Sequence, residues 1–314
     1  MDWIEVYITR RAAEAHSIVS LELMPVDGGE LPSFESGAHI DVQIETDLLR
    51  QYSLCNDSAE RHRYLIAVLN TPDSRGGSKR LHETFLEGRR IRIGKPRNSF
   101  PLSPSENQTV LAAGGIGITP LLCMAYKLSK EKRNFELHYC ARSRSSAAFV
   151  QNIQFGRLAS RSAFYFDDEN GSPKLVLPSF VEGMHLYICG PSGFMHHVLN
   201  LASGLGWPTS CVHTEFFEQQ ARPVDARPFV VRAARSNVSI PVSTDMTIAN
   251  ALSKVGIEVP LSCEVGVCGT CLTRVISGTP DHLDTFQTDE EKCKNTHIAV
   301  CCSRSLSDEL VLDL

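Results

Sequence analysis

Three cysteines stand close together in the C-terminal third of the sequence, on a loop that also carries glycines. Cys263, Cys268 and Cys271 follow the spacing C-x4-C-x2-C, and a fourth thiol, Cys301, lies downstream. Glycine between the cysteines has a physical use, because a loop that wraps a small group needs left-handed backbone positions and close approach of its N–H groups. Four thiolates brought together in this way can hold one small inorganic centre.

The spacing of these cysteines favours iron–sulfur chemistry over zinc. C-x4-C-x2-C with a distant fourth cysteine is typical of plant-type ferredoxins, in which thiolates hold a 2Fe–2S cluster. Zinc is usually bound by two C-x2-C pairs or by a mixture of Cys and His, and only one such pair is present. Spacing alone leaves the fourth ligand open between Cys301 and its neighbour Cys302.

The bulk properties of the chain exclude several classes of protein. With 314 residues, the chain is long enough for two or three domains. The net charge is -5, whereas a nucleic-acid binder usually carries an excess of positive charge. The start of the chain is acidic where a signal peptide would be basic, so we expect a cytoplasmic protein. The uncharged stretch 107–126 is interrupted by glycines and Pro120, so we expect no membrane span.

The first hundred residues read as short strands separated by Gly, Pro and Asp. Such a pattern predicts a small antiparallel β-barrel, assigned to residues 1–103. The expected strands cover 5–9, 17–23, 39–44, 51–55 and 63–68.

The middle of the chain alternates strands and helices, which predicts an α/β domain with a parallel sheet over residues 104–222. The expected strands are 109–113, 135–140, 163–166 and 185–189, and the expected helices are 120–131 and 194–205. The remainder, 223–314, is predicted to be an α+β ferredoxin domain with strands at 229–232, 238–242 and 309–314 and a helix at 248–255.

A glycine-rich turn, 114–120, follows an apolar strand and opens a helix. Bare N–H groups at a helix N-terminus can bind a pyrophosphate, and the alternative is a tight turn without a ligand; the strand–turn–helix context favours the pyrophosphate. The acid that usually binds the ribose at the end of the next strand is missing, and the chain there reads Ala141-Arg142-Ser143-Arg144. These residues leave the choice between NADH and NADPH open.

A second candidate phosphate site combines two stretches of the predicted barrel. Arg50 lies on a predicted strand, and the segment Arg75–His82 offers a Gly-Gly turn with Ser78 as the N-cap of a short helix. A guanidinium beside a helix N-terminus would bind a phosphate.

Taken in order, these motifs resemble one family over the whole chain, that of phthalate dioxygenase reductase and vanillate O-demethylase reductase. The motifs are Arg50-x-Tyr52-Ser53, Gly76-Gly77-Ser78, Gly114 to Pro120, Cys189-Gly190-Pro191, Glu215-Phe216-Phe217 and the closing stretch Cys301 to Leu314. The closing stretch marks Cys301 as the fourth ligand in this resemblance.

The resemblance implies that FMN lies across the barrel, with its phosphate held by Arg50 and the turn at Gly76 to Ser78. Tyr52 would pack along the flavin and Ser53 would hydrogen-bond near its N5. Nicotinamide is expected between the flavin, Thr119 and the turn at Cys189, with Phe217 covering the other side. The expected catalytic residues are Ser53, Thr119, Cys189 and Phe217. The expected cofactor-binding residues are Arg50, Gln51, Tyr52, Ser53, Leu54, Ala67, Val68, Gly76, Gly77, Ser78, Gly114, Gly115, Gly117, Thr119, Pro120, Arg142, Ser143, Cys189, Gly190, Pro191 and Phe217.

The implied function is that of a reductase component, in which electrons pass from NADH through FMN and the cluster to a Rieske-type oxygenase that acts as an O-demethylase or ring dioxygenase. One alternative is a reductase for a di-iron monooxygenase, which typically carries its ferredoxin module first. A remote alternative is a non-enzymatic zinc-binding interaction protein. The acids of the last domain either steer docking of the partner or are simply solvated, namely Asp281, Asp284, Asp289, Glu290 and Glu291.

Overall fold

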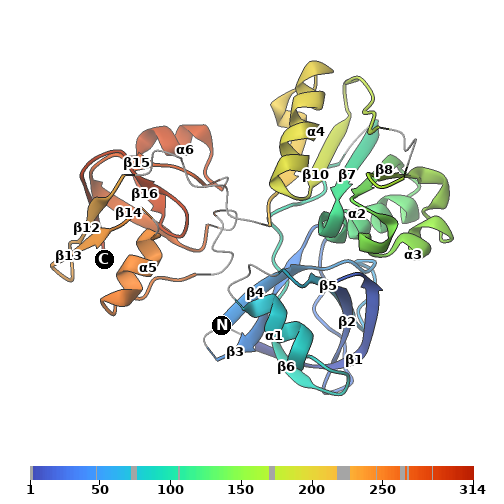
Figure 1. The fold of residues 1–314 in the computed structure, drawn as a ribbon, viewed down its shortest axis with the longest axis horizontal. Helices are drawn as coiled ribbons and strands as arrows, with labels where there is room; N and C mark the ends of the chain where they lie inside the picture. The colour runs from blue at the N-terminus through green and yellow to red at the C-terminus, as the bar shows by residue number, and fades with distance from the viewer. Residues whose placement is uncertain are drawn as a thin grey trace. The chain divides into compact units, whose positions relative to one another are not determined.

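Two units, Met1–Glu215 and Phe216–Leu314, make up the chain in this computed structural model (Figure 1). The structure describes residues 3–46, 48–71, 76–104, 107–169, 174–217, 227–244, 246–261, 266, 269–284 and 286–314. The first unit contains both an antiparallel and a parallel sheet. The expected division of this unit after residue 103, and the boundary at 222/223, stay predictions.

The antiparallel sheet of the first unit has the strand order β4-β3-β6-β1-β2-β5. Its elements are β1 (Trp3–Ala15), β2 (Ile18–Pro25), β3 (His39–Glu45), β4 (Leu48–Ser53), β5 (Tyr64–Leu69), β6 (Arg90–Gly94) and helix α1 (Gly77–Thr84). Side chains alternate along β1, where Val6 and Ile8 are buried and Tyr7 is exposed, as a one-sided core requires. A bridge between Leu54 and Ile66 connects the two edge strands, so the sheet closes on itself as a barrel.

The parallel sheet has the order β11-β10-β7-β8-β9. Its elements are β7 (Gln108–Gly114), η1 (Gly115–Gly117), α2 (Ile118–Lys130), β8 (Asn134–Ala141), η2 (Arg144–Ser146), α3 (Val150–Gln154), η3 (Ala159–Arg161), β9 (Ser162–Phe166), β10 (His185–Cys189), α4 (Ser192–Gly204), η4 (Thr209–Cys211) and β11 (Val212–Glu215). The chain runs from β7 to one side through β8 and β9, then crosses to the other side with β10 and β11. The order of strands therefore reverses between β7 and β10, and open α/β sheets bind ligands in the crevice at such a point.

The uncharged stretch 107–126 lies within this sheet, where it forms β7, η1 and the start of α2. In the described part of the chain, no helix combines the length and the apolar character needed to cross a membrane.

The two sheets of the first unit share a hydrophobic core. Ile18, Ala67 and Phe100 from the barrel side belong to the same buried cluster as Leu111 and Leu137 of the parallel sheet. The hydroxyl of Tyr187 also connects the two parts, because it accepts a hydrogen bond from the Ser103 N–H at 2.7 Å. The shared core fixes the strand ends of the barrel relative to the switch point of the parallel sheet.

The second unit is built on a sheet of order β13-β12-β18-β14-β16, in which β12 and β18 are parallel. Its elements are β12 (Phe229–Ala233), β13 (Val238–Val242), α5 (Ile248–Lys254), β14 (Leu272–Ser277), β15 (Pro280–Asp281), α6 (Asp289–Lys294), β16 (His297–Ala299), β17 (Arg304–Ser305) and β18 (Glu309–Leu312). Both readings of the acids, docking and solvation, fail for Asp284, because it is only 2% exposed. Asp289, Glu290 and Glu291 are exposed, as either reading requires.

Candidate functional site

The switch point of the parallel sheet brings together two predicted motifs. The glycine turn after β7 and the Cys189-Gly190-Pro191 turn after β10 lie at the carboxyl ends of adjacent strands. Their backbones touch, since a Cβ atom at Gly117 would stand 2.2 Å from the carbonyl oxygen of Cys189. In the same way, a Cβ atom at Gly190 would stand 2.9 Å from Cα of Gly114. Glycine is therefore required where the two turns meet.

Ser53, Cys189 and Glu215 meet beside this switch point, although they come from β4, β10 and β11. Cys189 is paired with Glu215 in the register of β10 and β11, and the Ser53 hydroxyl hydrogen-bonds to the Glu215 carboxyl. All three are less than 9% exposed. Burial raises the pKa of Glu215 to about 8, and the hydrogen bond with Ser53 only partly offsets it. Burial, together with the carboxyl of Glu215, also raises the pKa of the Cys189 thiol.

Glu215 is the site residue that the sequence analysis missed, although it opens the recognised Glu215-Phe216-Phe217 motif. Among the described residues, its Oε2 atom is one of the buried polar atoms without a hydrogen-bond partner. A carboxyl group held in this state is unusual for a structural residue and typical of functional sites. No strand was predicted at 212–215, so the available signal was the place of Glu215 at the start of that motif.

In the parent chain, the free energy of unfolding should fall as the pH rises because of Glu215, and Glu215→Gln is expected to remove this fall. The folded pKa of about 8 lies above the ordinary value, so the folded chain binds a proton that the unfolded chain has lost. This stabilisation is complete below about pH 4 and disappears as the pH rises through about 8. The melting temperature of the parent chain should therefore fall toward or below that of Glu215→Gln between about pH 5 and pH 8 and then level off. Glu182→Gln, which changes an exposed glutamate of the same unit, is the control; parallel curves for all three proteins would contradict the prediction.

The described residues of the predicted phosphate cradle lie together on the barrel side of the first unit. Gly76 takes a left-handed conformation with φ 85° and precedes α1. A Cβ atom at Gly77 would lie 2.8 Å from Nε of Arg50, so the arginine side chain rests on bare backbone at the helix N-terminus. A guanidinium beside unsatisfied helix N–H groups fits a phosphate. Arg50 also donates to the Leu49 carbonyl at 2.7 Å.

The expectation that Ser78 caps this helix is wrong. Gly76 is the N-cap, no side chain caps the helix, and Ser78 lies in the first turn. The Ser78 hydroxyl instead accepts a hydrogen bond from the Thr71 N–H at 3.3 Å. The helix starts earlier than predicted because glycine can adopt the left-handed backbone needed before its first turn.

Of the other predicted flavin-side residues, four are buried or half-buried and Gln51 is hydrogen-bonded to a neighbouring strand. Tyr52 is half-buried against the barrel core, and burial raises the pKa of its hydroxyl while nearby Arg50 opposes the shift. Leu54, Ala67 and Val68 are buried. Gln51, in contrast, donates to Asp41 of the neighbouring strand β3 at 3.1 Å.

The predicted nucleotide-side residues lie after β7 and β8. Thr119 is 2% exposed, follows Gly117 at the start of α2 beside Pro120, and donates to the Ile116 carbonyl at 3.0 Å. Ser143 caps η2, and its N–H and hydroxyl both bond Ser146. Arg142 is exposed. Gly115, at the turn itself, has φ 52°.

Arg144, which could have contacted a 2′-phosphate, is engaged with its own unit. Its guanidinium donates to Glu169 at 3.3 Å and to Gln154 at 3.1 Å, and it lies over the Phe166 ring at 4.7 Å. Three consecutive exposed acids, Asp167 to Glu169, follow β9 at the same edge of the sheet.

Two of the four predicted metal ligands are among the described residues. Cys271 and Cys301 are 4% and 2% exposed and belong to one buried cluster of the second unit. Cys263 and Cys268 lie outside the described residues. Buried thiols beside a loop with left-handed glycines, such as Gly269 with φ 70°, fit a 2Fe–2S cluster. Phe217, expected over the nicotinamide, is 38% exposed at the start of the second unit.

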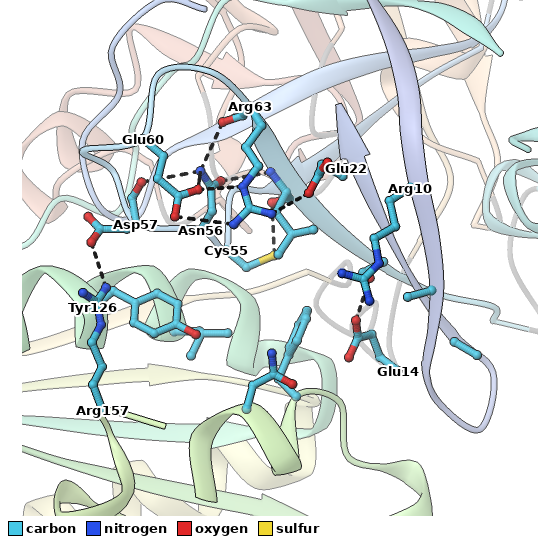
Figure 2. A pocket seen from close by; sticks show the side chains of 17 residues that line it. Arg10, Glu14, Glu22, Cys55, Asn56, Asp57, Glu60, Arg63, Tyr126 and Arg157 are labelled. Atoms are coloured by element: carbon cyan, nitrogen blue, oxygen red, sulfur yellow. Dashed lines mark hydrogen bonds and ion pairs between the residues drawn. The ribbon is translucent and has the colours of Figure 1, made fainter. Parts of the chain in front are cut away.

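A separate cavity of about 520 Å³ lies between the barrel and α2 and α3, and none of the predicted site residues lines it (Figure 2). Its charged side chains bind one another. Arg63 pairs with Glu22 and Glu60, and Arg157 donates to Asp57 at 2.7 Å. Arg157 also lies over the ring of Tyr126 at 4.6 Å. Of these pairs, Arg157–Asp57 joins the two parts of the first unit across the cavity, whereas Arg63 pairs within the barrel part.

Arg157→Gln is expected to weaken this join by about 1 kcal/mol at neutral pH, the usual order for a partly exposed ion pair. Burial would raise the pKa of Asp57, but hydrogen bonds from Arg157 and the Ala59 N–H hold it below its ordinary value. The contribution is thus present above about pH 4 and is lost as the pH falls through the folded pKa. Urea unfolding should show a gap between the two proteins at pH 7 that closes at acid pH. The exposed Lys174→Gln is the control, and an equal gap at both pH values would refute the assignment.

Comparison with known proteins extends this picture to the whole chain. Residues 231–306 match the family model of the 2Fe–2S iron–sulfur cluster binding domain. The chain is 47% identical to vanillate O-demethylase oxidoreductase of a Pseudomonas species, over 99% of this chain and 100% of the relative. It is 38% identical to phthalate dioxygenase reductase of Burkholderia cepacia, over 99% and 98%.

A solved structure of phthalate dioxygenase reductase, described as a modular structure for electron transfer from pyridine nucleotides to [2Fe–2S], matches with a TM-score of 0.77 and 37% identity. The match covers 99% of this chain and 98% of that one. The resemblance stated from the motifs is thereby confirmed. The chain belongs to the family of vanillate O-demethylase oxidoreductase and phthalate dioxygenase reductase, oxidoreductases of oxygenase systems that use NADH, FMN and a 2Fe–2S cluster.

Proposed function

We propose that this chain is the reductase component of a Rieske-type oxygenase, taking hydride from NADH and delivering single electrons to its partner. The observation that carries the proposal is the placement of three parts in one chain. A phosphate cradle at Arg50 and Gly77 and a nucleotide-type switch point belong to the same unit, and a 2Fe–2S domain follows. A bound flavin would accept a hydride and release its electrons one at a time, the conversion that such an assembly needs.

In this proposal the residues of the first unit bind and orient rather than transfer groups. Arg50 and the N-terminus of α1 hold a phosphate, which fixes one end of the cofactor. Tyr52 and Val68 give an apolar wall beside it. Thr119 and the backbone contact between Gly117 and Cys189 set the width of the crevice in which a nicotinamide would lie.

Glu215 keeps this crevice uncharged at neutral pH. A carboxyl group with a pKa of about 8 retains its proton at pH 7, and Ser53 holds it in place through a hydrogen bond. Because Ser53, Cys189 and Glu215 are all buried, water is displaced from the point at which the two turns and β4 meet.

We also infer a preference for NADH over NADPH. Arg144 is paired with Glu169, and the acids at 167–169 would repel a 2′-phosphate. Initial rates with the two nucleotides at equal concentration measure the preference directly. Faster reduction with NADPH would mean that Arg142 or Arg144 leaves its present position to bind the phosphate.

The partner is an oxygenase, as the names of the relatives indicate for those proteins, which include a phenoxybenzoate dioxygenase subunit and a tert-butanol monooxygenase reductase. For this chain we propose a Rieske-type partner that acts on an aromatic acid or methoxy-aromatic compound. The strongest support is the 47% sequence identity to vanillate O-demethylase oxidoreductase, which extends over 99% of this chain.

Reconstitution tests the proposal. The purified chain, NADH and the oxygenase encoded nearest to it should convert vanillate or a related aromatic acid, and omission of any one component should stop turnover. Cytochrome c reduction by the chain alone checks that the reductase is active. A chain that reduces cytochrome c but supports no Rieske oxygenase would overturn the assignment of the partner and leave the reductase chemistry standing.

A further inference from the structure

Three buried polar atoms without a hydrogen-bond partner lie within one short segment of the second unit. In the part of the chain that the structure describes, they are Nδ1 of His282, Oδ1 of Asp284 and Oε1 of Gln287. The side chains of His282 and Asp284 are 9% and 0% exposed. An unpaired buried polar atom costs free energy, so each one in a folded protein calls for an explanation, such as a redox or catalytic role.

The Asp284 carboxylate is held in one position by its neighbours. Its Oδ2 accepts a hydrogen bond from the Gln287 N–H at 2.8 Å, and its backbone carbonyl accepts one from Nζ of Lys292 at 2.6 Å. The adjacent Leu283 N–H donates to the Ser303 hydroxyl at 3.1 Å. Nδ1 of His282 stands 3.8 Å from Oδ1, which is too far for a hydrogen bond. One oxygen of a fixed carboxylate is therefore left without a donor.

Asp284 packs against Gly266, a described residue of the cysteine loop. A Cβ atom at Gly266 would stand 3.0 Å from Cα and 3.2 Å from Cβ of Asp284, and 2.6 Å from Sγ of Cys302. Gly266 stands between Cys263 and Cys268 in the sequence, and its φ of 82° is one that glycine adopts readily. Only a residue without a side chain allows the loop to approach Asp284 this closely.

We propose that Asp284 lowers the reduction potential of the 2Fe–2S cluster by holding a buried negative charge against the cysteine loop. The inference rests on the cluster and on the electron transfer proposed above. Reduction adds one electron to the cluster, and a nearby negative charge opposes that addition. The effect is strong at a buried site because solvent screens the charge poorly. Net charge and hydrogen bonding around the sulfurs are known determinants of cluster potential. A lower potential makes the reduced cluster a stronger donor to its partner.

Asp284→Asn tests the proposal, because the amide keeps the shape of the side chain and removes its charge. The midpoint potential of the cluster in the full-length holoprotein, titrated with dithionite, should rise. We expect a change of about tenfold in the one-electron equilibrium, which corresponds to about 59 mV. The EPR spectrum of the reduced cluster should remain unchanged, since the four ligands are not altered.

Glu290→Gln is the matched control. It makes the same change in net charge on the same unit, but Glu290 is exposed and pairs with Lys294 at 2.8 Å, so the potential should not move. An unchanged potential in Asp284→Asn overturns the proposal. Loss of iron or an altered EPR spectrum also overturns it, because Asp284 would then serve assembly or ligand geometry. Dithionite replaces NADH and no oxygenase is needed, so failure of the proposed function would not affect this measurement.

Discussion

Cys271→Ser should abolish the 2Fe–2S absorption of the protein and reduce electron transfer to cytochrome c by at least about 100-fold, while NADH still reduces the flavin. Cys271 is 4% exposed and shares a buried cluster with Cys301. A serine hydroxyl is a much poorer ligand for iron than a thiolate, which is the form in which cysteine binds metals. The first unit has its own core and should remain folded. Visible absorption and iron content measure the cluster, and stopped-flow reduction of the flavin by NADH measures the reaction in the first unit.

Two other cysteines of the same unit provide controls. Cys293 is exposed, so Cys293→Ser should keep both the cluster and the rate. Cys302 is the more demanding control, because it adjoins Cys301 and its sulfur lies over Gly266. Its Sγ is 3.7 Å from the Ala299 carbonyl oxygen, a contact that serine can replace. Cys302→Ser should therefore retain the cluster and Cys301→Ser should lose it. The opposite pattern would show that Cys302 is the fourth ligand.

The sequence pattern predicted the strands and helices whose own residues carry a clear apolar periodicity. The strands at 185–189 and 238–242 are confirmed with the expected bounds, and the helix expected at 120–131 forms at Ile118–Lys130. The strands β6, β11, β14, β15, β16 and β17 were not predicted. Val212–Glu215 has only one strongly apolar residue, and it becomes a strand because β10 pairs with it in register. Such pairing is a property of the sheet, and no window of the sequence contains it.

The candidate site, like the fold, was predicted where local motifs indicate it and missed where a residue's surroundings come from distant parts of the chain. The phosphate cradle followed from a guanidinium and a glycine turn, and the structure brings Arg50 and Gly77 together. The role of Glu215 could not be inferred from its neighbours, because its burial depends on Ser53 in the barrel and on Cys189 in the next strand. Asp284 was misread for the same reason. It follows other acids in a polar stretch, and only the folded loop at Gly266 covers it.

Gly117→Ala should lower the rate of flavin reduction by NADH by about 100-fold, a loss that a misplacement of about 1 Å can cause. The added Cβ would stand 2.2 Å from the carbonyl oxygen and 2.4 Å from the carbonyl carbon of Cys189, and 2.6 Å from the nitrogen of Gly190. All three are backbone atoms, so no side chain can rotate away. The φ of Gly117 is −62°, which alanine adopts readily, so the effect is steric and not conformational. The turns after β7 and β10 must therefore move apart at the switch point.

Gly193→Ala is the matched control, because it lies in α4 beside the same crevice and nothing stands within 4 Å of its Cβ position. Alanine also favours a helix over glycine by about 1 kcal/mol, so this variant should keep its rate and its stability. Thermal unfolding and dithionite reduction of both variants separate a displaced crevice from a misfolded unit. A Gly117→Ala protein that binds its cofactors, melts near the parent temperature and still reacts normally with NADH would show that the crevice does not hold the nicotinamide. Slow reaction with NADH and normal reaction with dithionite would instead locate the loss at the step in which the two turns position the nucleotide.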